Sequence, residues 1–116
     1  MKEFPEKYRH DLAIIRETAT LLIRDFEMHG VTLTFSGSEN NAWEELHMQL
    51  CPALAGMYAD NRNSFRAILY QVDISEAQFR KLTNETTSDN FISELASLII
   101  QREFQKILTR RFFSAK

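Results

Sequence analysis

The apolar residues near the start of the chain recur every three or four positions, as they do on one face of an α-helix. This pattern predicts a helix from about Pro5 to His29. Proline suits the first turn of a helix, and Gly30 suits its end because glycine readily adopts a left-handed backbone conformation. The apolar face consists of Tyr8, Leu12, Ile15, Ala19, Leu22 and Phe26.

A second long apolar pattern lies near the end of the chain and predicts a helix that ends at about Phe112. Thr86 or Thr87 is the expected N-cap of this helix, and Asp89 falls in its first turn, where the helix dipole favours an acid. The apolar residues of this pattern are Phe91, Leu95, Leu98, Ile99, Ile100, Phe104, Ile107 and Leu108.

Shorter helices are expected between these two. The first spans about Ala42 to Tyr58, and Pro52 should kink or split it because proline lacks a backbone N–H. The second covers Phe65 to Val72, with a strand as the alternative because its β propensity is high. The third is short and begins after Ser75, which suits an N-cap.

The segment from Val31 to Phe35 alternates apolar and polar residues, a pattern typical of a strand. No other segment of the chain offers it a partner of the same kind. We therefore expect an extended segment that crosses the helices, with Val31, Leu33 and Phe35 packed against them. The alternative is pairing with the same segment of a second subunit.

These elements and the scarcity of turn residues predict an all-α domain. The chain has three glycines and two prolines, few of the residues that the tight turns of β proteins require. Its 116 residues are the length of one ordinary domain. We expect a single helical domain over residues 1–116, an irregular or up-and-down bundle of four to five helices with long N- and C-terminal helices.

The cysteine content, the first residues and the length of the apolar runs predict where in the cell the protein is located. Cys51 is the one cysteine, so the chain cannot form an internal disulfide. The first residues are polar and carry both signs of charge, unlike a signal peptide. No apolar run approaches the roughly 20 residues needed to cross a bilayer. We expect a cytoplasmic protein that does not associate with membranes.

Positive charge is concentrated at the end of the chain. Residues 1–100 carry a formal charge of −6, whereas residues 101–116 carry +4. Cations interleaved with aromatic rings can bind nucleic acid or another anion. The simpler interpretation is that they suit a helix C-terminus and pair with acids, and the net negative charge argues against a nucleic-acid binder. The candidate anion-binding residues are Arg102, Lys106, Arg110 and Arg111.

Glu44, His47 and Cys51 are candidates for chemistry on the predicted second helix. Glu44 and His47 have the i, i+3 spacing of the Glu-x-x-His pairs that bind two metal ions, but that chemistry needs a second pair, which the chain lacks. His47 is four residues before Cys51 and could act as its base. The apolar neighbours of Cys51 favour a buried, inert thiol instead. We expect no metal and no cofactor.

The C-terminal run from Phe91 to Phe113, together with Leu69-Tyr70-Gln71-Val72-Asp73-Ile74-Ser75, resembles small uncharacterised proteins of Bacteroidetes-type bacteria. This resemblance involves no specific motif and implies no activity.

By elimination, the preferred hypothesis is a non-enzymatic interaction protein. Phe112 and Phe113 lie where an isolated chain has little to cover them, and exposed apolar patches usually mark interfaces. A homodimer is the commonest way to cover such a patch. The alternatives are an anion or nucleic-acid binder that uses the basic tail, and a metal- or thiol-dependent enzyme centred on Glu44, His47 and Cys51.

Overall fold

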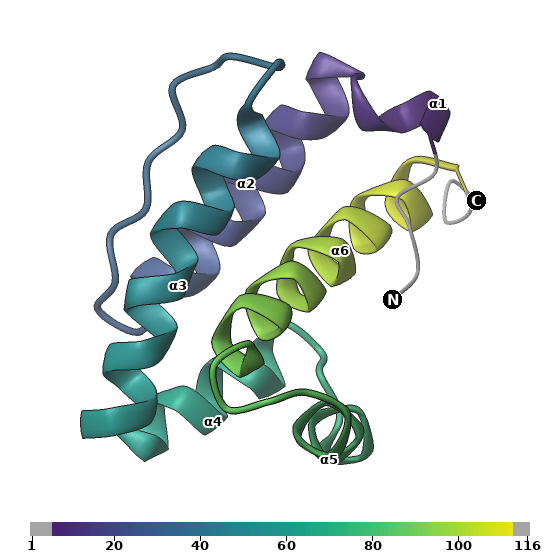
Figure 1. Cartoon of the computed structure of the whole chain (residues 1–116). Coiled ribbons are helices and arrows are strands. Elements are labelled where there is room, and N and C mark those ends of the chain that lie inside the picture. The colour runs from purple at the N-terminus through teal and green to yellow at the C-terminus, as the bar shows by residue number, and fades with distance from the viewer. Residues whose placement is uncertain (1–5, 113–116) are drawn as a thin grey trace.

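The chain folds as a bundle of α-helices, which confirms the predicted all-α class (Figure 1). The computed structural model describes residues 6–112. Within this range there are one single helical turn and five longer helices, and no strand. The elements are α1 (Glu6–Arg9), α2 (Leu12–Glu27), α3 (Ala42–Asp60), α4 (Arg62–Gln71), α5 (Glu76–Glu85) and α6 (Phe91–Phe112).

The long first helix predicted from the sequence is interrupted near its start. Asp11 has an extended backbone, and its side chain accepts hydrogen bonds from the backbone N–H groups of Ala13 and Ile14 at 3.0 and 3.2 Å. These two bonds satisfy donors that a new helix leaves without a partner, so the chain breaks into α1 and α2 here. The end of α2 is as predicted, with Gly30 at a φ of +82° just beyond it.

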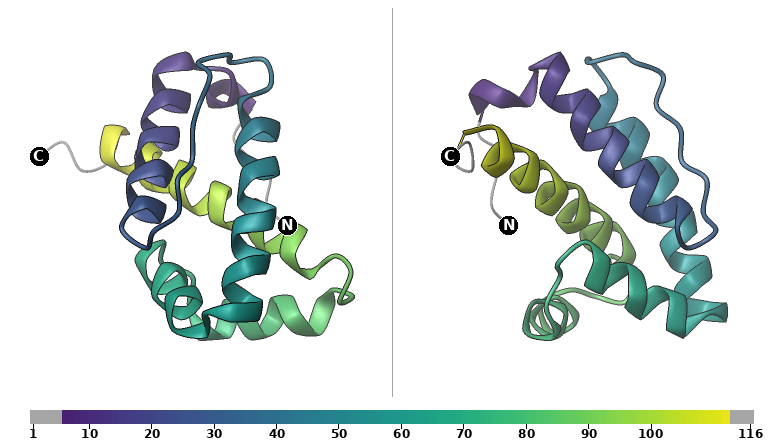
Figure 2. Two further views of the ribbon diagram at one scale, coloured as in Figure 1. Left: turned by 90° about the vertical axis from the view of Figure 1, so that its left-hand side faces the viewer. Right: turned by 180° about the vertical axis from the view of Figure 1, so that it is seen from behind.

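The helices α2 and α3 run in the same direction, because the connection between them returns along their length (Figures 1 and 2). Both pack mainly on α6 rather than on each other. The extended segment predicted at residues 31–35 forms part of this connection and buries Leu33 in the core, which is the crossing arrangement expected. The Gln49 side chain bonds both the N–H and the C=O of Thr34 at 2.8 Å, as a neighbouring strand would.

Pro52 does not split α3, which continues through it to Asp60. The backbone bond that proline cannot make would have been to the carbonyl of Met48. Pro52 and Met48 are both exposed, so this carbonyl lies on the side of the helix that faces water. Water can therefore hydrogen bond to the Met48 carbonyl, and the helix continues without a break.

The helices α4 and α5 close one end of the bundle (Figure 1). The predicted helix over α4 is confirmed, and Ser75 begins α5 with a capping box to Gln78, as its position suggested. No residue of α5 is fully buried. It is fixed chiefly through Phe79, whose ring lies 5.9 Å from that of Phe65 and 5.5 Å from that of Phe91.

The last helix, α6, begins at Phe91, later than the predicted caps Thr86 and Thr87 imply. The prediction that Thr86 or Thr87 caps α6 was wrong, because Thr86 instead ends α5. Its N–H and hydroxyl groups both donate to the carbonyl of Leu82, at 3.1 and 2.8 Å. Buried side chains are distributed around most of the circumference of α6. It contacts α2 on one side, α3 on another and α5 on a third.

We predict that Asp11→Ala lowers the free energy of unfolding by about 1 kcal/mol, because two N–H groups at the start of α2 lose their acceptor. Urea denaturation measures this change. Asn41→Ala is the matched control: Asn41 precedes α3, but its side chain caps no backbone N–H. Equal losses in the two variants would contradict the role of Asp11.

Candidate functional site

The structure brings His47 and Cys51 together but not Glu44. His47 Nε2 lies 3.0 Å from the carbonyl oxygen of Ser93, so it donates there, and Nδ1 is left to accept from the Cys51 thiol at 3.7 Å. Burial raises the pKa of Cys51, which favours the neutral thiol over the thiolate that a nucleophile requires. Glu44 is exposed, and no cluster of three or more metal-ligating side chains exists within residues 6–112.

Ion pairs engage the predicted anion-binding residues Arg102, Lys106 and Arg111. Arg111 forms a two-pronged contact with Glu17 at 2.9 and 3.3 Å. Arg102 and Lys106 lie 3.9 and 3.6 Å from the carboxylate of Asp73. Arg110 is exposed at the end of α6. Arg102, Lys106 and Arg111 thus join α6 to neighbouring segments of the chain.

The predicted interface residues lie at the very end of α6. Phe112 is 47% exposed, and its ring stacks on Tyr8 of α1 at 5.1 Å. Phe113 lies outside the residues that the structure describes.

A pair of buried carboxyl groups, absent from the sequence-based candidates, joins α2 to α6. Asp25 and Glu103 are 1% and 0% exposed, and Asp25 acts on the Glu103 carboxyl group as a hydrogen-bond partner that raises its pKa. Two carboxyl groups can share such a bond only when one of them keeps its proton. Burial raises the pKa of Glu103 to about 8, and the bond to Asp25 acts in the same direction. Glu103 is therefore mainly protonated at neutral pH.

The ammonium group of Lys106 lies 2.8 Å from Glu103 Oε1 and acts to lower the pKa of Glu103. This contact connects the carboxyl pair to the surface of the protein. The same ammonium group also lies 3.6 Å from Asp73, and Asp25 accepts from Gln71 at 3.5 Å. A signal for this cluster existed in the sequence, because Asp25 and Glu103 fall at helical spacing within the two apolar patterns.

Two grooves flank α5. The first, here called the arginine groove, has a volume of about 520 Å³ and lies where the end of α3, α4 and the start of α5 meet. Its apolar lining is aromatic and aliphatic, and three arginines surround it. The lining residues are Tyr58, Arg62, Phe65, Arg66, Leu69, Tyr70, Ile74, Ser75, Glu76, Phe79 and Arg80.

The arginines of this groove are arranged around exposed aromatic surface. Tyr70 is 85% exposed, and the guanidinium of Arg62 lies 4.0 Å from the centre of the Tyr58 ring. No carboxylate within residues 6–112 is at ion-pair distance from Arg66 or Arg80. The sequence did carry part of this pattern, since Arg62, Arg66 and Tyr70 are spaced four apart along one helix.

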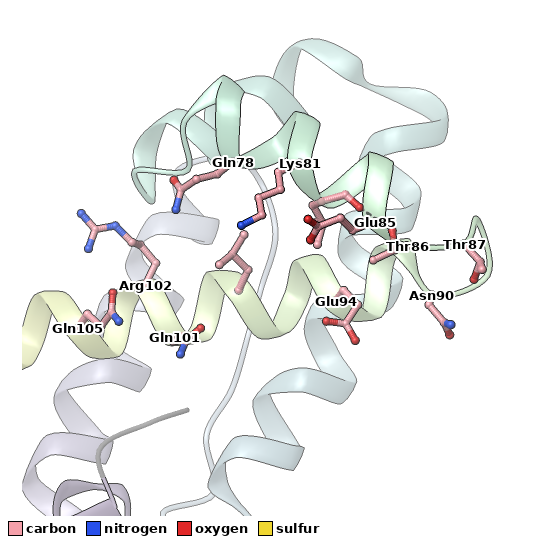
Figure 3. A pocket seen from close by; sticks show the side chains of 12 residues that line it. Gln78, Lys81, Glu85, Thr86, Thr87, Asn90, Glu94, Gln101, Arg102 and Gln105 are labelled. Atoms are coloured by element: carbon pink, nitrogen blue, oxygen red, sulfur yellow. Dashed lines mark hydrogen bonds between the residues drawn. The ribbon is translucent and has the colours of Figure 1, made fainter. Parts of the chain in front are cut away.

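The second groove, here called the polar groove, lies between α5 and α6 and has a volume of about 640 Å³ (Figure 3). Amide and charged side chains dominate its lining. Both volumes are in the range of small-molecule binding sites. The helix with the least buried surface thus forms one wall of both grooves.

The chain matches no protein-family model, and comparison with curated proteins and with solved structures finds no similar protein. In the described part of the chain, no helix combines the length and apolar character that crossing a membrane requires.

We predict that the free energy of unfolding falls as the pH rises from 5 to 8, by up to about 1.4 kcal/mol per pH unit from Glu103 alone. In this range the folded protein keeps a proton on Glu103, with its pKa of about 8, while the unfolded chain releases it near the ordinary value of 4.5. The folded state binds more protons, so rising pH favours unfolding. Urea denaturation across this pH range measures the slope.

Glu103→Gln should remove this part of the pH dependence, because an amide can donate to Asp25 at every pH. Glu17→Gln is the control, since Glu17 is exposed and pairs with Arg111. A slope that is the same in Glu103→Gln and in the unmodified protein would show that Glu103 does not hold the proton.

Proposed function

We propose that the protein is a non-enzymatic binding protein whose arginine groove receives an acidic segment of a partner protein. The observation that carries this proposal is the combination of exposed Tyr70 with Arg62, Arg66 and Arg80 around an apolar floor. Tyrosine and arginine are the residue types that contribute most often to the energy of protein interfaces.

The charge of the groove supports an acidic partner. Three arginines and one carboxylate, that of Glu76, line it. The chain as a whole carries a formal charge of −2, so the groove is positive within an acidic protein. An acidic segment would be attracted to the groove and repelled from much of the remaining surface.

The floor of the groove favours a peptide with an apolar side chain among its acidic residues. Phe65, Leu69 and Ile74 are buried there, and Phe79 closes the floor from α5. A leucine or phenylalanine of the partner can bury its side chain against this surface, while the arginines bind neighbouring carboxylates as planar, two-pronged donors. The arginines and the floor therefore recognise different parts of the same segment.

We predict that a fluorescein-labelled ten-residue peptide of alternating Glu and Leu binds the protein and that added salt weakens the binding. Arg66→Glu and Tyr70→Ala should each raise the Kd by about tenfold or more, as expected for central interface residues. Fluorescence anisotropy measures the Kd, and circular dichroism verifies that each variant is folded.

Arg16→Glu is the matched control, because Arg16 is an exposed arginine of α2 that does not line the groove. A peptide of alternating Lys and Leu tests the sign of the charge. The proposal fails if the acidic peptide does not bind, if Arg66→Glu binds it as well as Arg16→Glu does, or if a single-stranded oligonucleotide binds more tightly.

Self-association through the end of α6 is a second candidate role, favoured by the 47% exposure of Phe112. We predict that the protein elutes as a dimer in size-exclusion chromatography with light scattering and that Phe112→Ser shifts it towards the monomer. Met48→Ser is the control, since Met48 is 74% exposed on α3. A monomer at all concentrations, or equal effects of the two substitutions, would count against this role.

A further inference from the structure

We propose that the proton held by the carboxyl pair of Asp25 and Glu103 regulates the arginine groove, because it determines whether Lys106 holds the turn between α4 and α5. This turn, residues 72–75, is here called the corner. Ile74 and Ser75 of the corner line the arginine groove, so a change in the corner alters the groove. The effect on partner binding rests on the function proposed above, whereas the release of the corner does not.

The corner has a backbone conformation that is completed by a side chain of α6. Asp73 has a φ of +65°, in the left-handed region that favours glycine. The N–H group of Ile74 donates to the carbonyl of Leu69 at 2.9 Å and closes the turn. The carbonyl of Gln71, at the end of α4, accepts instead from the ammonium group of Lys106 at 3.4 Å. Lys106 therefore fastens the end of α4 to α6.

The same ammonium group lies between the corner and the buried carboxyl pair. Lys106 Nζ is 2.8 Å from Glu103 Oε1 and 3.6 Å from Asp73 Oδ2. Arg102 is 3.9 Å from the Asp73 carboxylate, so Lys106 is the closer of these two cations. One positive charge thus interacts with a carboxyl group on each side. A stronger attraction to the buried side draws it away from the corner.

The charge of the buried side depends on one proton. At neutral pH Glu103 keeps this proton, because burial and the contact with Asp25 raise its pKa to about 8. The pair then carries a single negative charge. When the proton is lost, two negative charges lie close together in the core, and Lys106 is at ion-pair distance to balance them. Lys106 is then drawn towards the pair, and its contacts with Asp73 and Gln71 weaken.

Few other charges act on the carboxyl pair. The charged groups that influence Glu103 are Asp25 of α2 and Lys106 of α6 itself. The end of α4 contributes the neutral amide of Gln71, which donates to Asp25 Oδ1 at 3.5 Å. The residues that α3 buries are apolar, and the charged residues of α5 are exposed. The change in charge at this site above neutral pH therefore comes from Glu103.

NMR titration of the full chain from about pH 7 to about pH 9.5 tests the release of the corner. The side-chain ¹³C carboxyl signal of Glu103 reports its own titration, and the methyl ¹³C signal of Ile74 reports the corner, since Ile74 is buried in the core. Both signals should change with a midpoint at about pH 8. Glu103→Gln should remove the step in the Ile74 signal. Glu27→Gln, which changes an exposed acid of α2, should retain it.

Asp73→Asn distinguishes the release of the corner from a direct effect of the charge on Glu103. Asparagine also adopts the left-handed conformation, and Asp73 is exposed, so the variant keeps the turn. Glu103 should titrate as before. The step in the Ile74 signal should shrink by about half or more, because Lys106 no longer has a carboxylate to leave at this position. A direct effect of the Glu103 charge would leave the step unchanged.

The effect on the groove is measured with the fluorescein-labelled peptide of alternating Glu and Leu. Its Kd should rise by about threefold between about pH 7 and about pH 9.5, as expected when a partly exposed ion pair weakens. In Glu103→Gln the Kd should be the same at both pH values. Fluorescence anisotropy measures each Kd.

The proposal is overturned if Glu103 does not titrate in this range, or if the Ile74 signal shows no step while Glu103 titrates. It is also overturned if Asp73→Asn leaves the step unchanged, or if the Kd of the unmodified protein is independent of pH. Binding of the peptide at neither pH would instead overturn the partner site, and the Ile74 signal would still decide whether the corner is released.

Discussion

The burial of α6 on several sides is the constraint on which the rest of the structure depends. The helices α2 and α3 contact α6 far more than they contact each other, so they become one layer only because both pack on the same helix. Leu33 from the extended connection then joins the core that this layer forms. A helix buried around most of its circumference has few positions where a polar side chain can reach water. Gln101 and Glu103, which are buried on α6, are consequences of this geometry.

The opposite condition holds for α5, which has no fully buried residue. A cluster of rings, Tyr58, Phe65, Phe79 and Phe91, holds it against α3, α4 and α6, with ring centres 5.0 to 5.9 Å apart. A helix with so few buried contacts belongs to the least stable part of a fold, and binding surfaces are often drawn from such parts. The arginine groove borders α5, so the proposed partner site lies beside the helix that contributes least to the buried core.

Much of the fold could be predicted because the signals were local. The apolar spacing identified the long helices, and Ser75 identified the start of α5. The break at Asp11 was missed because a capping residue can also lie within a helical pattern, and only the backbone conformation distinguishes the two. The arginine groove was not predicted, since Arg80 joins Arg62 and Arg66 only through the packing of α5 against α4. The thiol–imidazole contact was expected from the spacing of His47 and Cys51. The hydrogen bond from His47 to the carbonyl of Ser93 was not, because it depends on how α6 packs on α3.

The carboxyl pair of Asp25 and Glu103 also affects how charge should be counted in this protein. The formal net charge of −2 treats every carboxyl group as ionised. With the pKa of Glu103 at about 8, the folded protein at pH 7 is nearly one unit less negative than this count. The unfolded chain has no such pair, so the folding reaction itself takes up a proton from the solution. The heat of folding at neutral pH therefore depends on the buffer that supplies this proton, and the isoelectric point of the folded protein lies above that of the unfolded chain.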